Sequence, residues 1–351
     1  MAHTTALQSV PSTPIKKWSQ WLYRAFRLNV RPTVKVYHGF GDAHKMEVFG
    51  HVFKVSPFRE DKFSSRVLHN SLSLLRLFMV KPFRHAVVEL DGYGLTTITD
   101  EKGFFRFEFE PSQLPEPGWH TVRVKFLHRK YTGVYGEGKI MVPEPTKYGI
   151  ISDIDDTFLV SHSSDLRKRL YVLLTKNART RMPFSNVVEH YRLLARGDNG
   201  KPRPFFFVSS SEWNLYDYIR DFSDSYEMPQ GIYLLNELKE IDEILATGQN
   251  KHESKYLRIA RLLTKYPERK FILLGDDSQK DPEIYHKVVR DFPGRIVCIY
   301  LRHVNKANLP SGRRYEAAIK NLGVEICYHT HSHTAIEHSR KMGLVNEDIT
   351  P

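Results

Sequence analysis

The first half of the chain alternates apolar and polar residues in short segments. Between residues 32 and 143 such segments are separated by turn signals, including Asp91-Gly92 and the stretch 100–103. A period of two residues with regular turns is typical of half-buried antiparallel strands, and several in succession favour a β-sandwich. The segments expected to form strands are 34–36, 46–55, 86–90, 104–109 and 121–126.

The pattern changes after Pro143-Glu144-Pro145, which reads as a linker. Three runs beyond it, 148–151, 205–208 and 271–274, are apolar throughout, and an amphipathic helical segment opens at Lys255. Continuous apolar strands alternating with helices are typical of an α/β sheet that is covered on both faces. We therefore expect three parts: a basic amphipathic segment (1–30), a small β-sandwich domain (31–143) and an α/β domain (146–345).

Two carboxylates follow the first apolar run. Asp153 and Asp155 flank Ile154, and Thr157 comes two residues later. Because residues i and i+2 of an extended segment share a face, both acids can face one reacting centre while Ile154 packs inside. Open α/β sheets bind their ligands at the carboxyl ends of the strands, which is where this pair would lie.

The other apolar runs also end in polar groups. Ser209, Ser210 and Ser211 follow the second run, and Asp276 and Asp277 follow the third. Singly, these are explained equally well as a polar strand cap and an acidic turn, and Lys255 as a solvated helix residue. Together, and in this chain order, they predict a site for phosphoryl transfer.

The stretch 150–157 contains the string DxDxT, which resembles motif I of the haloacid dehalogenase superfamily. The resemblance implies a Rossmann-like catalytic domain with Asp153 as the nucleophile and Asp155 as the general acid and base. It further assigns the Ser209 hydroxyl to the transferring phosphoryl group and Lys255 to charge neutralisation. The pattern GDxxxxD at 275–281 is similar to motif IV, whose acids complete a magnesium site.

A magnesium ion suits the chemistry expected here. A phosphomonoester repels a carboxylate nucleophile unless cations screen its charge. Mg²⁺ prefers oxygen ligands and retains several waters, so a few protein oxygens suffice. The expected ligands are the side chains of Asp153 and Asp276 with the carbonyl of Asp155, and a role for Asp277 or Asp281 is left open.

A narrower resemblance rests on three further stretches. The segment 275–285, the triplet Asp291-Phe292-Pro293 and the segment 299–302 look like the catalytic domain of the actin-patch-type phosphatidate phosphatases and their bacterial relatives. This family implies a Mg²⁺-dependent hydrolase of lipid metabolism, with phosphatidate as the known substrate class, and its bacterial relatives carry a small sandwich module. On this resemblance we expect Thr157, Ser210 and Arg302 to bind substrate.

Two departures from the family pattern put the substrate in doubt more than the reaction. The family usually reads Ser-Asn-Ser-Pro-Trp after the second run, whereas this chain has Ser209-Ser210-Ser211-Glu212-Trp213. It usually reads Gly-Asp-Ser-Gly after the third, whereas Gly275-Asp276-Asp277-Ser278 adds an acid.

Charge and cysteine content bear on partners and compartment. The 351 residues carry a net charge of +12, which favours anionic partners such as phospholipid surfaces, phosphorylated metabolites or, less readily, nucleic acid. Cys298 and Cys327 lie in apolar contexts, so we expect free buried thiols in a reducing, cytoplasmic compartment. The chain starts without a signal-peptide pattern and has no apolar stretch of about 20 residues.

Residues 14–28 combine apolar, aromatic and basic side chains at helical spacing. Such a helix can lie on a membrane surface, which would make the protein peripheral, or it can pack on the second domain with its charges in water.

Three functions remain open at this point. The first is a Mg²⁺-dependent phosphomonoesterase that forms an aspartyl-phosphate on Asp153, with phosphatidate phosphatase as the narrower activity that the family resemblance implies. The second is the same chemistry on soluble phosphomonoesters or nucleic-acid ends, and the third is a non-catalytic lipid-binding adaptor. The presence of Asp153, Asp155, Ser209, Lys255 and Asp276 together argues against the third.

Overall fold

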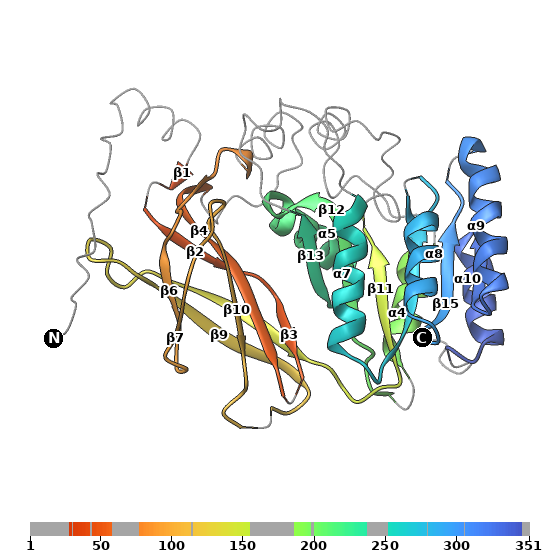
Figure 1. The fold of residues 1–351 in the computed structure, drawn as a ribbon, viewed down its shortest axis with the longest axis horizontal. Coiled ribbons are helices and arrows are strands. Elements are labelled where there is room, and N and C mark those ends of the chain that lie inside the picture. Colours follow the sequence, from red (N-terminus) through yellow and green to blue (C-terminus); the bar gives the residue numbers. More distant parts are fainter. Residues whose placement is uncertain are drawn as a thin grey trace.

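A computed structural model describes residues 28–57, 77–154, 186–236 and 252–345, apart from positions 30, 43, 114, 198, 199, 279 and 305. It contains a mostly antiparallel β-sheet region in the first half of the chain and a six-stranded parallel sheet with helices in the second (Figure 1). The expected amphipathic segment lies outside the described residues except for Leu28, and Asp155 and Thr157 lie outside them too.

The N-terminal sheet has ten strands, and the long strand β4 (Met46–Pro57) pairs with five of them. Every strand pair is antiparallel except that between β3 and β10. The other strands are β1 (Leu28–Asn29), β2 (Thr33–Val36), β3 (Gly39–Gly41), β5 (Lys81–Pro82), β6 (Val87–Leu90), β7 (Leu95–Ile98), β8 (Phe104–Phe109), β9 (Gly118–Leu127) and β10 (Tyr135–Val142).

All five strands expected from the alternating pattern are present, and their inward residues, such as Val88, Phe107 and Val124, form a buried core. The sequence did not indicate β10, because Gly136 and Gly138 interrupt its apolar pattern. A Cβ atom at Gly136 would lie 2.3 Å from the Val34 carbonyl oxygen, so these glycines allow β10 to approach β2 closely. The sandwich arrangement and the domain boundaries stay predictions.

The parallel sheet has the order β13-β12-β11-β14-β15-β16, and all its pairs are parallel. The three apolar runs that we expected to form strands are β11, β12 and β14 of this sheet. This agreement confirms the mixed α/β class. The strands are β11 (Tyr148–Asp153), β12 (Phe205–Glu212), β13 (Ile232–Asn236), β14 (Lys270–Asp276), β15 (Ile296–Arg302) and β16 (Glu325–His329).

Helices cover both faces of this sheet. Neighbouring helices α7, α8 and α9 lie on one face, and α4 and α10 contact each other on the other (Figure 1). Within α7, Ile259, Leu262 and Leu263 are buried, whereas Leu257 is 59 % exposed. The helices are α4 (Val187–Arg196), α5 (Tyr216–Ser225), α7 (His252–Lys265), α8 (Asp281–Asp291), α9 (Leu309–Asn321) and α10 (Ser332–Lys341), with short 3-10 turns η2 (Trp213–Leu215) and η3 (Lys306–Asn308).

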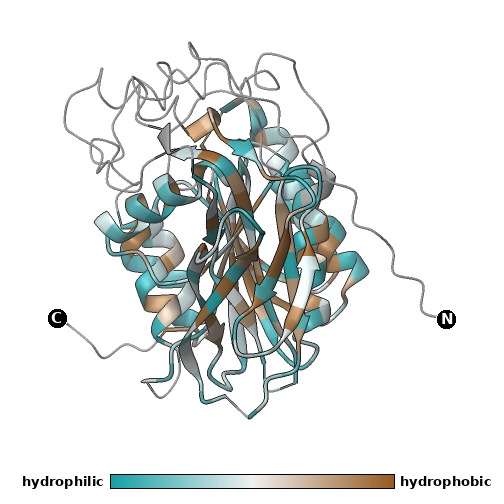
Figure 2. Ribbon diagram, turned by 90° about the vertical axis from the view of Figure 1, so that its left-hand side faces the viewer, coloured by the Kyte–Doolittle hydropathy of each residue, from teal (hydrophilic) through white to brown (hydrophobic). Residues whose placement is uncertain are grey.

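The two sheet regions share one hydrophobic core. Phe40 and Phe49 of the N-terminal sheet belong to the same buried cluster as Phe206 and Tyr266 of the α/β region. Figure 2 shows many hydrophobic residues along the central strands, whereas the helices at either side carry both hydrophilic and hydrophobic residues. No helix among the described residues is long and apolar enough to cross a membrane.

Both cysteines are free and buried, as expected. Burial raises the pKa of the Cys298 thiol to about 12 and that of Cys327 to about 11, so both stay protonated at neutral pH.

The buried His51 makes stability sensitive to acid. Tyr37 lies 3.0 Å from its Nδ1, and burial lowers the pKa of His51 to about 3 from an ordinary value of 6.5. As pH falls from 6.5 toward 3, the unfolded chain takes up a proton that the folded chain refuses, which costs stability of about 1.4 kcal/mol per pH unit. We predict that His51→Gln has a lower free energy of unfolding than the wild type at pH 7. In urea titrations this difference between wild type and variant should shrink by about 2 kcal/mol between pH 7 and pH 5. The control is His333→Gln at an exposed position.

Candidate active site

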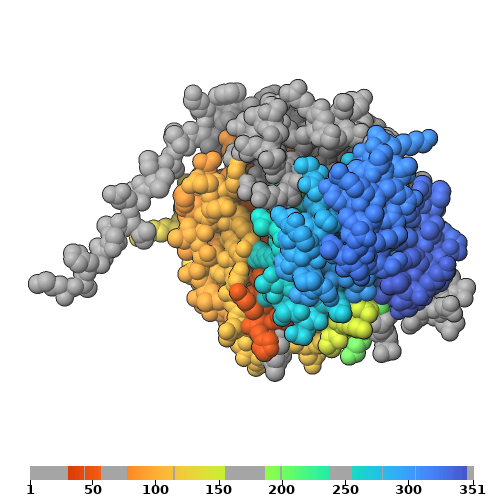
Figure 3. All heavy atoms as spheres, turned by 45° about the vertical axis from the view of Figure 1, so that its right-hand side comes forward, coloured from red at the N-terminus to blue at the C-terminus, as the bar shows by residue number. Residues whose placement is uncertain are grey.

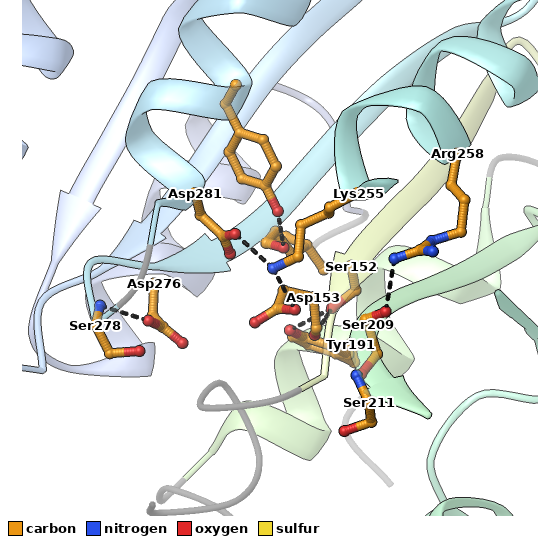
Figure 4. A network of polar contacts seen from close by, with 12 residues as sticks. Ser152, Asp153, Tyr191, Ser209, Ser211, Lys255, Arg258, Asp276, Ser278 and Asp281 are labelled. Carbon is orange, nitrogen blue, oxygen red and sulfur yellow. Dashed lines mark hydrogen bonds and ion pairs between the residues drawn. The ribbon is translucent and has the colours of Figure 1, made fainter. Parts of the chain in front are cut away.

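The carboxyl ends of three neighbouring strands bring the expected site residues together. Asp153 ends β11 and pairs with Val208, so Ser209 follows one residue beyond it on β12. On the other side Ser152 pairs with Leu274 of β14, which ends at Asp276. The parallel register therefore places these side chains at one edge of the sheet (Figure 4).

Lys255 of α7 is the centre of this cluster. Its ammonium Nζ lies 2.7 Å from Oδ1 of Asp153 and 2.6 Å from Oδ1 of Asp281, at the start of α8. Each of the three residues is at most 2 % exposed. Removing the ammonium or a carboxylate would leave an uncompensated charge in the interior, so the three groups hold one another in place.

Asp281 is a site residue whose role the sequence left open. Its carboxylate serves Lys255, and the closely packed Gly275 and Tyr285 limit its movement: a Cβ at Gly275 would meet Asp281 Oδ2 at 2.6 Å. The sequence signal for Asp281 was the spacing in GDxxxxD. This spacing places the second aspartate in the first turn of α8, at the same edge of the parallel sheet as the first aspartate.

Arg258 was not anticipated. It lies three residues after Lys255 on α7 and donates hydrogen bonds to the carbonyl oxygens of Ser209, at 2.9 Å, and Leu235, at 3.3 Å. Because residues three apart share one side of a helix, α7 presents both cations to the strand ends. Arg258 thereby ties the serine segment to the helix that carries Lys255.

The three serines lie at the end of β12 and are all buried. The Ser209 hydroxyl accepts a hydrogen bond from the backbone N–H of Ser211 at 2.9 Å. The pairing of β12 with β13 shifts register between Val208 and Glu212, so this part of the strand is irregular. Figure 4 shows Ser209 and Ser211 next to Asp153.

A hydroxyl pair supports the backbone of Asp153 from the opposite face. Ser152 donates to the Asp153 carbonyl oxygen at 2.8 Å, and its oxygen lies 2.8 Å from the hydroxyl of Tyr191 on α4. Burial raises the pKa of Tyr191, with the charges of Asp153 and Asp276 acting in the same direction. Tyr191 therefore stays protonated.

The acids after β14 have different surroundings. Asp276 accepts from the backbone N–H of Ser278 at 2.6 Å and lies near Asp153 in Figure 4. The Asp277 carboxylate faces the other way: Oδ1 accepts from Val304 N at 2.8 Å, and Oδ2 accepts from Tyr328 at 2.6 Å and contacts His303. Both of its oxygens are thus engaged in linking β14 to β15 and β16, and a part for Asp277 in metal binding stays open.

Arg302 ends β15 beside Asp276 in the ladder. Its guanidinium donates to the Thr330 carbonyl oxygen at 3.0 Å and to the Ser332 hydroxyl. Burial lowers its pKa, and the charge of Asp276 acts in the opposite direction. The substrate-binding role expected of Arg302 and Ser210 stays a prediction.

The charges at this edge bear on metal binding. Among the described residues, the carboxylates of Asp153, Asp276 and Asp281 gather at this edge together with the cations of Lys255, Arg258 and Arg302. Carboxylate oxygens suit a hard cation such as Mg²⁺, which needs only one or two of them. Asp153 and Asp276 fit that role. No group of three or more candidate metal-binding side chains gathers within the described part of the chain.

The fold and site thus define an α/β domain in which an aspartate and a lysine meet at the carboxyl edge of a parallel sheet. Residues 148–303 match the family described as "Phosphatidate phosphatase APP1, catalytic domain". This segment of the chain is therefore similar to the APP1 catalytic-domain family, and the resemblance noted in the sequence is confirmed.

Two curated proteins align with the same part of the chain. "Phosphatidate phosphatase APP1" of Saccharomyces cerevisiae is 27% identical over 158 residues, which is 45% of this chain and 26% of that protein. An uncharacterized protein of Schizosaccharomyces pombe is 28% identical over 160 residues, 44% of this chain and 25% of its own length. The chain thus spans about a quarter of each relative.

We predict that Lys255→Met lowers the free energy of unfolding by about 3–5 kcal/mol, because Asp153 and Asp281 would remain buried without their cation. Urea titration measures this loss. The control is Lys341→Met at the exposed end of α10, which should change stability by less than about 0.5 kcal/mol. Equal stability of the Lys255 variant and the control would show that the ion pairs do not hold the site together.

Proposed function

We propose that the protein is a Mg²⁺-dependent phosphomonoesterase that acts through an aspartyl-phosphate on Asp153, with phosphatidate as the favoured substrate. The observation that carries the proposal is the buried ammonium of Lys255 between Asp153 and Asp281, with Asp276 and Ser209 at the same edge. Its position inside a segment matched to a phosphatase family supports it. On this proposal the domain is a Rossmann-like haloacid dehalogenase catalytic domain.

Each residue of the site has a part in this reaction. Lys255 holds the Asp153 carboxylate ionised and oriented, so that the second oxygen of Asp153 can attack phosphorus. The Ser209 hydroxyl and the Lys255 ammonium stabilise charge on the phosphoryl oxygens as the ester bond breaks. Asp155 protonates the leaving alkoxide and then removes a proton from the water that hydrolyses the aspartyl-phosphate.

Magnesium is the cofactor that we propose for this site. Asp153 and Asp276 would hold it together with the carbonyl of Asp155. When bound, it screens the charge of the phosphate and of the nucleophile.

The alternative reaction on soluble phosphomonoesters or nucleic-acid ends uses the same residues. The net charge of +12 suits any of these anions. The name of the Saccharomyces cerevisiae relative favours phosphatidate, as does the possibility of peripheral membrane contact through residues 14–28. A non-catalytic adaptor would have no need for a buried nucleophile fixed by a lysine, and we place it last.

We predict that Asp153→Asn reduces kcat by about 10⁴-fold or more, since the amide is not nucleophilic. Hydrolysis of p-nitrophenyl phosphate measures kcat, and circular dichroism checks the fold. Asp277→Asn is the matched control: it removes an adjacent buried carboxylate that contacts His303 and Tyr328, and it should keep kcat within a few-fold. EDTA should abolish hydrolysis by the wild type, and added Mg²⁺ should restore it. Turnover by the Asp153 variant would overturn the assignment.

We further predict that kcat/KM is higher for phosphatidate in liposomes than for glycerol 3-phosphate or a 5′-phosphorylated oligonucleotide. The lipid presents its phosphate on a surface that attracts a basic protein. Initial rates with the three substrates at equal phosphate concentration provide the comparison, and the Asp153→Asn variant supplies the background. A preference for either soluble substrate would assign the protein to the alternative.

A further inference from the structure

The N-terminal sheet contacts the α/β region at the residue that follows the buried serines. The ring of Tyr37 stacks on Trp213, with centroids 4.2 Å apart and planes at 19°. Phe49, His51 and Phe104 lie around the same indole, with centroids 5.6, 6.3 and 6.5 Å from it. Trp213 is only 8 % exposed, so side chains from the other region of the chain form much of its surroundings.

Trp213 is joined directly to the serine segment. It opens the turn η2 after Glu212, only two residues from Ser211 and four from Ser209. The next residue, Asn214, donates from Nδ2 to the carbonyl oxygen of Leu77 at 2.9 Å. A strand rises about 3.3 Å per residue, so only a short stretch of backbone, and no flexible linker, separates the indole from the serines. A shift of the indole therefore displaces the serines as well.

The same sheet also holds helix α7. The half-buried Arg261 forms an ion pair with the buried Glu47 of β4, and Lys265 donates to the Lys45 carbonyl oxygen at 2.5 Å. Glu47 is 3 % exposed, and burial raises its pKa while Arg261 lowers it. Tyr266, just after the helix, donates to the Gly41 carbonyl oxygen at 3.2 Å.

These contacts fix the helix that carries the site lysine. Arg261 is six residues from Lys255, which corresponds to about 9 Å along the helix axis. Figure 3 shows the β2–β4 segment against α7 at the surface. The N-terminal sheet therefore contacts both elements that deliver the Ser209 hydroxyl and the Lys255 ammonium.

We propose that the N-terminal sheet is a positioning part of the active site, which acts through Tyr37 on the serine segment and through Glu47 on helix α7. The inference rests on the proposed phosphatase function. Catalytic groups have to be held within about 0.5 Å of their productive geometry, and displacement by about 1 Å can cost about 100-fold in rate. Tyr37 and Glu47 are thus positioning residues that do not touch the substrate.

A module that merely packs beside the catalytic region would behave differently. Truncating any of its buried side chains would lower the stability of the protein, but kcat of the folded fraction would be unchanged. A positioning role can be distinguished from mere packing by two truncations of buried aromatic residues. One lies at the contact with Trp213, and the other lies in the core within the N-terminal sheet that contains Val88, Phe107 and Val124.

The experiment uses the full chain with three substitutions. Tyr37→Ala removes the stacking on Trp213, Tyr37→Phe keeps the ring, and Phe107→Ala truncates a buried aromatic residue of the separate core. At a temperature well below each Tm, we expect Tyr37→Ala to lower kcat for p-nitrophenyl phosphate about 10-fold or more. Tyr37→Phe should restore it, and Phe107→Ala should retain kcat despite a lower Tm.

A measurement that does not depend on turnover keeps this inference separate from the proposed function. Hydrogen–deuterium exchange should accelerate in segments 205–215 and 252–265 in Tyr37→Ala and stay as in the wild type in Phe107→Ala. A wild type that hydrolyses no phosphomonoester would overturn the phosphatase proposal, while exchange would still test the positioning. Unchanged exchange and kcat in Tyr37→Ala, or equal changes in Phe107→Ala, would overturn the positioning role.

Discussion

A single buried ammonium holds the candidate site together. Lys255 bridges Asp153 and Asp281, which belong to a strand and a helix that are far apart in the chain, and all three groups are removed from water. Such a cluster is costly to assemble and is stable only when every charge is paired. Its formation therefore requires β11, α7 and α8 to be packed correctly, which makes the site and the fold depend on each other.

The sequence predicts this arrangement as far as local pattern and topology allow. Continuous apolar runs identified β11, β12 and β14, and the rule that ligands bind at the carboxyl ends of parallel strands placed Asp153, Ser209 and Asp276 together. The apolar contexts of Cys298 and Cys327 likewise coincide with β15 and β16, whereas strand β13 and the partners of each polar group were beyond that reasoning. Arg258 is an example: its sequence neighbours mark it as a helix residue, and only the tertiary structure directs it to the Ser209 carbonyl oxygen.

The contact between the two sheet regions was harder to foresee. Alternating patterns show which face of a strand is buried, but they do not say what covers it. Tyr37 and His51 would have suited a core within the N-terminal sheet equally well, and yet they surround Trp213. Aromatic residues bury large areas and have strict geometric preferences, so this cluster joins the two regions more firmly than exposed ion pairs would.

The structure also gives a physical reason for one departure from the family pattern. The additional acid Asp277 is bound by Val304 N, Tyr328 and His303, and its backbone N–H donates to the Arg302 carbonyl oxygen at 2.9 Å. It therefore ties the ends of β14, β15 and β16 together beside the site. A carboxylate with donors on both oxygens has a structural task that an uncharged residue at position 277 would not fulfil in the same way. The additional acid is thus explained by the packing of three strand ends, without assigning it a part in the chemistry.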